Sequence, residues 1–252
     1  MPLRSDQCIC LRRYEYSESS QILALFGRET GLFRVIAKGA HRRTKAGESR
    51  FDGGIDLLDL GQAVMTDPAA KDLATLTEWK LLDGHLELRR EYRPLMLAQY
   101  AAEMTGLVLH ENDPHPELFD LLHWLLDELP TARREECFAV FQLELLRITG
   151  FLPELSGCIS CGRPIDTGRV TFSPQLGGLV CGDCPIAPGP RIASDARLIR
   201  ILQTLLRLPR ADGIPQRLPR MTRAQTDPVN RLLAEYLRYT LGHELRAAAF
   251  VV

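Results

Sequence analysis

Two cysteine pairs constrain the fold of this chain more than any other feature. Each pair has C-x-x-C spacing, "CISC" in the first and "CGDC" in the second, and nineteen residues separate them. Two such pairs supply four thiolates, which is the ligand set of a tetrahedral structural zinc site. The spacing therefore predicts one structural Zn²⁺ ion bound by Cys158, Cys161, Cys181 and Cys184.

Four thiolates would complete the coordination of the ion and leave no position for water or a substrate. We therefore expect the metal to stabilise a segment that is too short to bury a core of its own. Gly162 follows the first pair and Gly182 lies in the second, where tight turns are needed. Four unrelated thiols or a redox pair are less favoured alternatives. Cys8, Cys10 and Cys137 are expected to be small core residues.

Composition is that of a soluble globular protein. The chain has 252 residues, of which 45% are hydrophobic and 25% charged, as is ordinary for globular domains. No apolar run reaches the roughly 20 residues of a membrane helix, and "MPLRSDQCIC" lacks the apolar core of a secretory signal. We expect a cytoplasmic protein without membrane contact, in which thiols stay reduced.

Hydrophobic periodicity predicts a β-rich first part. Five runs have strand character: "QCICLRRYEY", "SQILALFG", "LFRVIAKG", "IDLLDLGQAVMT" and "DLATLTEWKLL". Five short antiparallel strands suit a Greek-key barrel of the OB type and, less well, an SH3-like barrel. In the first run the alternation places Cys8, Cys10, Arg12, Tyr14 and Tyr16 on one face.

From residue 83 onward apolar residues recur at helical spacing. Helices are predicted around 97–108, over "PELFDLLHWLLDEL", around 138–148, over "SDARLIRILQTLLRL", and from Asp227, with Asp227 as N-cap and Pro228 in the first turn. The expected fold class is therefore α+β. An N-terminal OB-fold β-barrel over residues 1–82 precedes an α-helical domain over 83–252, which an inserted four-cysteine zinc finger over 157–186 interrupts.

Charge is distributed unevenly, although the net charge is only −1. Residues 83–136 carry a net −7, residues 34–50 a net +5 and residues 189–223 a net +6. Runs of one sign are often only solvated surface, but these two basic regions favour an anionic partner. Candidate nucleic-acid-binding residues are Arg34, Lys38, His41, Arg42, Arg43, Lys45, Arg50, Arg197 and Arg200. The Arg-rich stretch could instead pair with the acidic helices.

Aromatic residues near the first basic region are candidates for stacking on bases, as in barrels that bind single strands. These residues are Tyr14, Tyr16, Phe26 and Phe51, of which Phe26 is more typical of a core. Such a surface offers no fixed geometry for reading base edges. We therefore expect non-specific, salt-dependent binding.

Catalytic motifs are missing from the sequence. "GAHRRTKAG" lacks the spacing of a phosphate-binding loop, and "HENDPH" is one residue too long for H-E-x-x-H. A nuclease is the least favoured possibility, because Asp52, Asp56 and Asp59 lack metal-site spacing. We expect a binding protein and not an enzyme. The two main candidates are a nucleic-acid-binding protein and a zinc-containing adaptor that acts only through protein–protein contacts.

These features together resemble the RecO family of recombination mediators. The resemblance is carried by "GLFRVIAKGAHRRTK" at residues 31–45, the barrel, the following helical domain, and "GCISCG" with "GGLVCGDC". It implies a cytoplasmic, nucleoid-associated protein that binds single- and double-stranded DNA and anneals complementary strands without ATP. It also implies partnership with RecR and single-strand-binding protein and, indirectly, with RecA.

By position, the resemblance implies DNA contacts at Lys38, Arg42 and Arg43 and zinc at the four paired cysteines. Members of the family differ in whether all four cysteines are kept. This sequence has all four, so zinc is expected.

Overall fold

The chain divides into two compact units, Met1–Pro130 and Thr131–Val252, and each is described by itself. The computed structural model describes residues 3–40, 51, 54–70, 73–165, 169–185 and 189–251. The boundary expected after residue 82 stays a prediction. No helix in the described part of the chain combines the length and apolar character that a membrane span requires.

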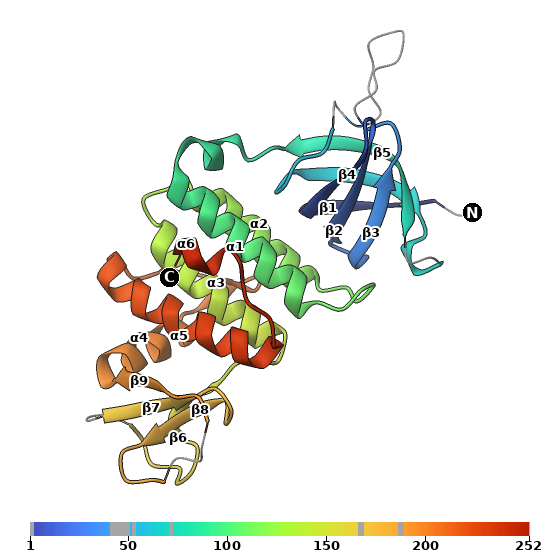
Figure 1. The fold of residues 1–252 in the computed structure, drawn as a ribbon. Helices are drawn as coiled ribbons and strands as arrows, with labels where there is room; N and C mark the ends of the chain where they lie inside the picture. The colour runs from blue at the N-terminus through green and yellow to red at the C-terminus, as the bar shows by residue number, and fades with distance from the viewer. Residues whose placement is uncertain are drawn as a thin grey trace. The chain divides into compact units, whose positions relative to one another are not determined.

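A closed five-stranded barrel begins the first unit (Figure 1). Its strands are β1 (Leu3–Ser17), β2 (Ser20–Gly27), β3 (Gly31–Ala37), β4 (Leu60–Thr66) and β5 (Ala74–Asp83), in the order β1-β2-β3-β5-β4. This OB-like barrel confirms the predicted fold class. However, β3 and β5 pair in parallel, with Val35 opposite Ala74. The prediction of antiparallel strands is therefore wrong for this pair, whose crossover runs through β4.

Strand β1 departs from the predicted alternation. Residues 8–11 are all buried, whereas Tyr14 and Tyr16 are exposed. The pairing of β1 with β2 shifts register between Cys10 and Arg12, and a bulge of this kind changes the face on which later side chains lie. The prediction that the cysteines and tyrosines share one face is therefore wrong.

Buried and more exposed side chains alternate along β3. Phe33, Val35 and Ala37 are buried, while Arg34 and Lys38 are exposed. On β5, the ring of Trp79 packs against the backbone of β4. A Cβ atom at Gly61 would lie 2.3 Å from that ring, so only glycine permits the close approach of the indole.

Two helices complete the first unit, α1 (Tyr92–Val108) and α2 (Pro116–Glu128), along with the short 3-10 helices η1 (Pro68–Ala70) and η2 (Leu86–Arg90). The rings of Phe26 and Phe119 meet edge to face, 5.6 Å apart. Arg28 donates two hydrogen bonds of 2.8 Å to Asp120. These contacts join α2 to β2 and its turn. Phe26 is thus a core residue, as its sequence context favoured.

Helices also form most of the second unit: α3 (Arg134–Ile148), α4 (Ala196–Leu206), α5 (Arg223–Leu241) and α6 (Ala248–Val251). Helices α3, α4 and α5 pack against one another. A two-stranded ribbon, β10 (Arg210–Ala211) and β11 (Ile214–Pro215), lies between α4 and α5 in sequence. The side chain of Asp195 caps α4 by accepting a 2.7 Å hydrogen bond from Leu198 N–H.

Helix α5 begins earlier than predicted, so Asp227 is not its N-cap. The N-cap is Thr222, in a capping box with Gln225, whose side-chain oxygen accepts a 2.9 Å hydrogen bond from Thr222 N–H. Pro228 consequently lies inside the helix. The T-x-x-Q sequence satisfies two free backbone donors, which makes it the stronger start signal.

A four-stranded sheet precedes α4 and is ordered β6-β8-β7-β9 (Figure 1). Its strands are β6 (Glu154–Cys158), β7 (Arg169–Ser173), β8 (Gly178–Cys181) and β9 (Ile192–Asp195). Strands β7 and β8 form an antiparallel hairpin between the cysteine pairs, with Phe172 opposite Leu179. Strands β6 and β9 were not predicted. The edge-to-face contact of Phe172 with Tyr236, at 5.4 Å, joins this sheet to α5.

Candidate metal centre and nucleic-acid interface

The four paired cysteines come together at one end of the β6–β9 sheet. Their sulfur atoms all lie within 4.8 Å of one another, and the sulfurs of Cys161 and Cys181 are 3.8 Å apart. Zinc–sulfur bonds of about 2.3 Å at tetrahedral angles place sulfurs about 3.8 Å apart. The cluster therefore fits one tetrahedral ion and could hold a metal.

Local backbone structure explains how the cysteines converge. Strands β6 and β8 end at Cys158 and Cys181, and a tight turn follows each. In the first turn Gly162 has φ +73° and donates a 2.7 Å hydrogen bond to Cys158 O. In the second turn Cys184 N–H donates to Cys181 O at 3.3 Å. Each turn brings the second sulfur of its pair back beside the first.

Backbone N–H groups favour ionisation of the first pair. Burial opposes ionisation of Cys158, but hydrogen bonds from backbone N–H groups, Cys181 first, outweigh it and lower its pKa to about 6. Cys181 N–H lies 3.3 Å from that sulfur. The backbone of Arg163 lowers the pKa of Cys161, whereas a hydrogen bond with Cys161 raises that of Cys184 to about 12. Because metals bind thiolates, the lowered pKa values of Cys158 and Cys161 favour metal binding, whereas the raised pKa of Cys184 opposes it.

The other cysteines are separate from this cluster. Cys8, Cys10 and Cys137 are fully buried. Burial strongly raises the pKa of Cys8 and of Cys10. They are the small core residues that the sequence predicted.

The predicted basic residues of the barrel are only partly described. Lys38 directly follows β3 and is exposed. Arg34 is also exposed, but its Nε lies 2.9 Å from a carboxylate oxygen of Glu111. Five further candidates lie outside the described residues, namely His41, Arg42, Arg43, Lys45 and Arg50. Among the described barrel candidates, Lys38 is thus the one for which no ion pair is found in the described part of the chain.

A cleft of about 470 Å³ lies along β1, β2 and β3. Arg12, Tyr14 and Arg34 line it together with Glu111 and apolar side chains. Arg12, which is half-buried, was not among the sequence candidates. Phe51 is buried at 3% exposure, so its prediction as a stacking residue is wrong.

A groove of about 280 Å³ lies on the second unit beside α4. The predicted residues Arg197 and Arg200 are exposed and form its basic rim with Arg220. Apolar side chains also line it, namely Ile201, Leu205, Pro219 and Met221. The sequence did not reveal the partnership of 197–205 with 219–221, because only tertiary folding brings these segments together.

Part of the Arg-rich stretch is used inside the second unit. Arg210 donates hydrogen bonds to both carboxylate oxygens of Glu144, whose side chain is 1% exposed. Arg147 also pairs with Glu144, at 2.6 Å. Arg210 therefore neutralises a buried acid of α3, which lies beyond the acidic region 83–136.

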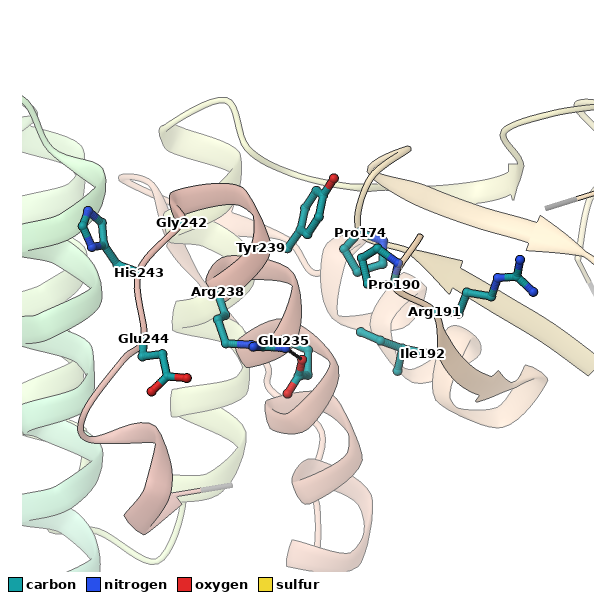
Figure 2. A pocket seen from close by; sticks show the side chains of 10 residues that line it. All are labelled: Pro174, Pro190, Arg191, Ile192, Glu235, Arg238, Tyr239, Gly242, His243 and Glu244. Carbon is teal, nitrogen blue, oxygen red and sulfur yellow. Dashed lines mark hydrogen bonds and ion pairs between the residues drawn. The ribbon is translucent and has the colours of Figure 1, made fainter. Parts of the chain in front are cut away.

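A further cavity, of about 550 Å³, lies where the end of α5 meets the segment before β9 (Figure 2). Arg238 points at Glu235, 2.7 Å away, and Arg191 points away from α5 (Figure 2). Glu244 adds a second negative charge to the lining. With its charges mixed in this way, the cavity offers no concentrated positive surface for phosphates.

Comparison with known proteins gives the family. The family model described as Recombination protein O N terminal matches residues 1–85, and Recombination protein O C terminal matches residues 89–249. A DNA repair protein RecO of Anaeromyxobacter dehalogenans (strain 2CP-C) is 31% identical over 245 residues, covering 96% of this chain and 93% of the relative. One of Desulforamulus reducens is 25% identical, covering 100% and 94%. The chain therefore belongs to the RecO family of DNA repair and recombination proteins.

Proposed function

We propose that this chain is a recombination mediator that binds single- and double-stranded DNA without sequence preference. In this proposal it anneals complementary strands without ATP and, with RecR, helps to load RecA onto single strands coated with single-strand-binding protein. It acts by binding and has no catalytic activity of its own. Its place of action is the cytoplasm, at the nucleoid.

The observation that carries the proposal is the cleft on the OB-like barrel, where Arg12 lies beside the exposed Tyr14. Barrels of this type bind single strands by pairing cationic side chains with phosphates and stacking aromatic rings on bases. Each stacked base contributes about 1–3 kcal/mol. Lys38 and the basic residues after it extend the same positive region along the sequence.

Annealing requires no active site. Cationic side chains neutralise phosphates, release counterions and so reduce the repulsion between two strands. Two strands held on one protein also have a raised effective concentration. Base pairing between the strands then supplies the specificity, which explains how a surface without base-edge contacts can promote correct pairing.

The direct test mixes complementary single strands with the purified, zinc-loaded protein in the absence of nucleotide and follows duplex formation by fluorescence. We expect faster annealing than with the strands alone, and an effect that weakens as salt is raised. The anisotropy of a single labelled strand, measured over the same salt range, reports binding separately. A strand that stays unbound even at low salt would contradict the proposal.

We further propose that the cysteine cluster holds one structural Zn²⁺ ion through Cys158, Cys161, Cys181 and Cys184. When bound, the ion would connect the turns after β6 and β8. The support is the fit between the sulfur separations and tetrahedral zinc. With four thiolate ligands the site has no position for a substrate.

For single-strand-binding protein we propose that the groove beside α4 receives an acidic, apolar tail. Its basic rim and apolar floor match such a segment in charge and polarity. A peptide of this kind should bind the wild-type chain and bind Arg200→Ala more weakly. The control is Arg231→Ala, which removes an exposed arginine of α5 outside the groove. Equal binding by both variants would remove the groove from the proposal.

The alternative function is a zinc-containing adaptor that contacts only proteins. The observation in its favour is that several exposed arginines of the first unit are already paired with acids: Arg13 with Asp56, Arg28 with Asp120, and Arg34 with Glu111. The annealing and anisotropy measurements separate the two functions, because an adaptor would leave both strands free.

A further inference from the structure

Three side chains of the first unit form a second cluster of metal-ligand type. His85 follows β5, and His123 and Asp127 lie four residues apart on α2. The Nε2 or Nδ1 atoms of the histidines and a carboxylate oxygen of Asp127 all lie within 4.8 Å of one another. Unlike the cysteine cluster, this group offers two nitrogens and one oxygen.

His85 is the fixed member of the cluster. Its side chain is 3% exposed, and Nδ1 lies 2.9 Å from the carbonyl oxygen of Leu58. Because a carbonyl only accepts, Nδ1 carries the proton and donates it to Leu58 O. The remaining nitrogen, Nε2, faces Asp127 and has no hydrogen-bond partner within the described residues. Buried polar atoms almost always have a partner, so this nitrogen indicates a ligand.

The backbone holds His85 firmly in place. His85 and Leu58 both adopt left-handed conformations, with φ 44° and φ 70°. For residues other than glycine such conformations are costly and persist only where the surroundings determine them. The backbone N–H of His85 also donates a 2.7 Å hydrogen bond to Asp83. The orientation of the imidazole is therefore set before any ligand binds.

The separations in the cluster are too long for hydrogen bonds but suit a shared ion. Nε2 of His85 lies 3.8 Å from Oδ1 of Asp127, and Nε2 of His123 lies 3.7 Å from Oδ2. Hydrogen bonds of this kind span about 2.7–3.2 Å. Ligand atoms bound to one tetrahedral zinc at about 2.0–2.1 Å lie about 3.3 Å apart, a distance that small side-chain rotations would reach.

The hydrogen bond from Nδ1 of His85 to Leu58 O leaves Nε2 as the nitrogen that can bind a metal. A neutral imidazole whose other nitrogen donates to a carbonyl is the usual state of a metal-bound histidine, because the second contact fixes the tautomer.

We propose that His85, His123 and Asp127 bind a divalent transition-metal ion of the zinc class. The ion would have three protein ligands and a further position open to water or to an external ligand. The ion would connect the segment after β5, which carries His85, to helix α2, which carries His123 and Asp127. The site is independent of the cysteine cluster, from which it differs in donor atoms and in sequence.

The test adds Co²⁺ to the full chain, already loaded with zinc at its cysteines and freed of loosely bound metal. We expect one further equivalent of cobalt to bind. Its visible absorption should lack the sulfur-to-cobalt charge-transfer bands that would reveal exchange at the thiolates. Histidine nitrogen resonances, followed by NMR during a matching Zn²⁺ titration, give a second measure and should shift for two imidazoles.

Two variants assign the site, His123→Ala and Asp127→Asn. Both side chains are partly exposed, so folding should be retained, which circular dichroism checks. Loss of either ligand should weaken metal binding by more than about 100-fold. Even the loss of a residue that only hydrogen-bonds to a metal ligand lowers metal affinity by about 10–100-fold. The matched control is His115→Ala. His115 is also paired with an aspartate, Asp113, at 3.2 Å, but belongs to no such cluster among the described residues.

Several results would overturn the proposal. Cobalt binding that occurs only at the thiolates would overturn it. A further equivalent of cobalt that both variants bind as tightly as the wild-type chain would also overturn it. Binding that His115→Ala weakens as much as His123→Ala would show only general attraction of cations to surface histidines. Metal uptake that depends on His123 and Asp127 but not on His115 would support it.

Discussion

At the scale of single residues, pairing decides which positive charges of the first unit are available to a partner. The guanidinium of Arg28 is bound by Asp120 and that of Arg34 by Glu111. Lys38, by contrast, lies at the end of β3 with no ion pair found in the described ranges. The acidic partners of Arg28 and Arg34 could not be identified from the sequence, because they are distant in the chain.

The basic region that begins at Lys38 leads to a prediction for DNA binding. Replacing Lys38, Arg42 and Arg43 together with alanine should weaken binding of single strands and reduce the salt slope by about 0.7 for each phosphate that is no longer neutralised. The slope of log affinity against log salt, from fluorescence anisotropy, measures this. Lys80→Ala is the control, because Lys80 is an exposed lysine of β5 outside the proposed surface. A slope equal to that of the wild-type chain would exclude these residues from the interface.

A second prediction concerns Asp59, a buried carboxylate of the barrel. Burial raises its pKa, although a hydrogen bond from Asp56 N–H opposes this. A raised pKa in the folded state means that its contribution to stability is fully present below the unfolded value, about 3.9. That contribution is lost as pH rises through the folded value. Asp59→Asn should therefore gain in melting temperature relative to the wild-type chain between pH 3 and pH 7.

Thermal melting across that range, recorded by circular dichroism, tests the sign of the effect. Glu78→Gln is the matched variant, because it removes an exposed carboxylate of the same barrel. A difference between Asp59→Asn and the wild-type chain that shrinks with rising pH would refute the assignment.

At the scale of elements, the sequence predicted structure that depends on neighbouring residues but did not predict pairing between distant segments. The turns at the cysteine pairs depend on neighbouring residues, and they were predicted from spacing. The parallel pairing of β3 with β5 and the short strands β6 and β9 depend on partners elsewhere in the chain. The start of α5 is a different case, since the T-x-x-Q signal at Thr222 was present but Asp-Pro at 227–228 was favoured over it.

The four-stranded sheet of β6–β9 gives a prediction at this scale. Removing zinc with a strong chelator should unfold β6–β9, because bound metal contributes about 10–16 kcal/mol of apparent free energy in small zinc peptides. Limited proteolysis with mass spectrometry should then find new cleavage sites within 154–195 and leave the barrel intact. Cys161→Ser should give the same pattern without chelator, whereas Cys137→Ser should not. Protection that survives metal removal would show that the sheet folds without it.

At the scale of the whole molecule, the two compact units divide after Pro130. Helices α1 and α2 belong to the first unit, where Phe119 covers the ring of Phe26 and Asp120 binds Arg28. The change from strand to helix periodicity was clear in the sequence. The sequence did not reveal which helices pack on the barrel, because the contacts join residues about ninety positions apart.

A fragment comparison tests this organisation. Residues 1–130 should fold alone, whereas residues 1–82 should melt at a lower temperature, because burying one phenylalanine contributes about 1.5–3 kcal/mol and the shorter fragment lacks the partner of Phe26. Circular dichroism melting of both fragments measures the difference. Equal melting temperatures would instead favour a barrel that is independent of α1 and α2.

Asp195 is at once the last residue of β9 and the N-cap of α4. No flexible linker separates the sheet that carries the cysteines from the helix that carries Arg197 and Arg200. Oxidants could convert the paired thiolates to disulfides and so displace β9. Because no loop separates β9 from α4, a movement of β9 would also move the arginines of α4. Redox damage at the sulfurs would thereby change the groove beside α4, whose lining includes no cysteine among the described residues.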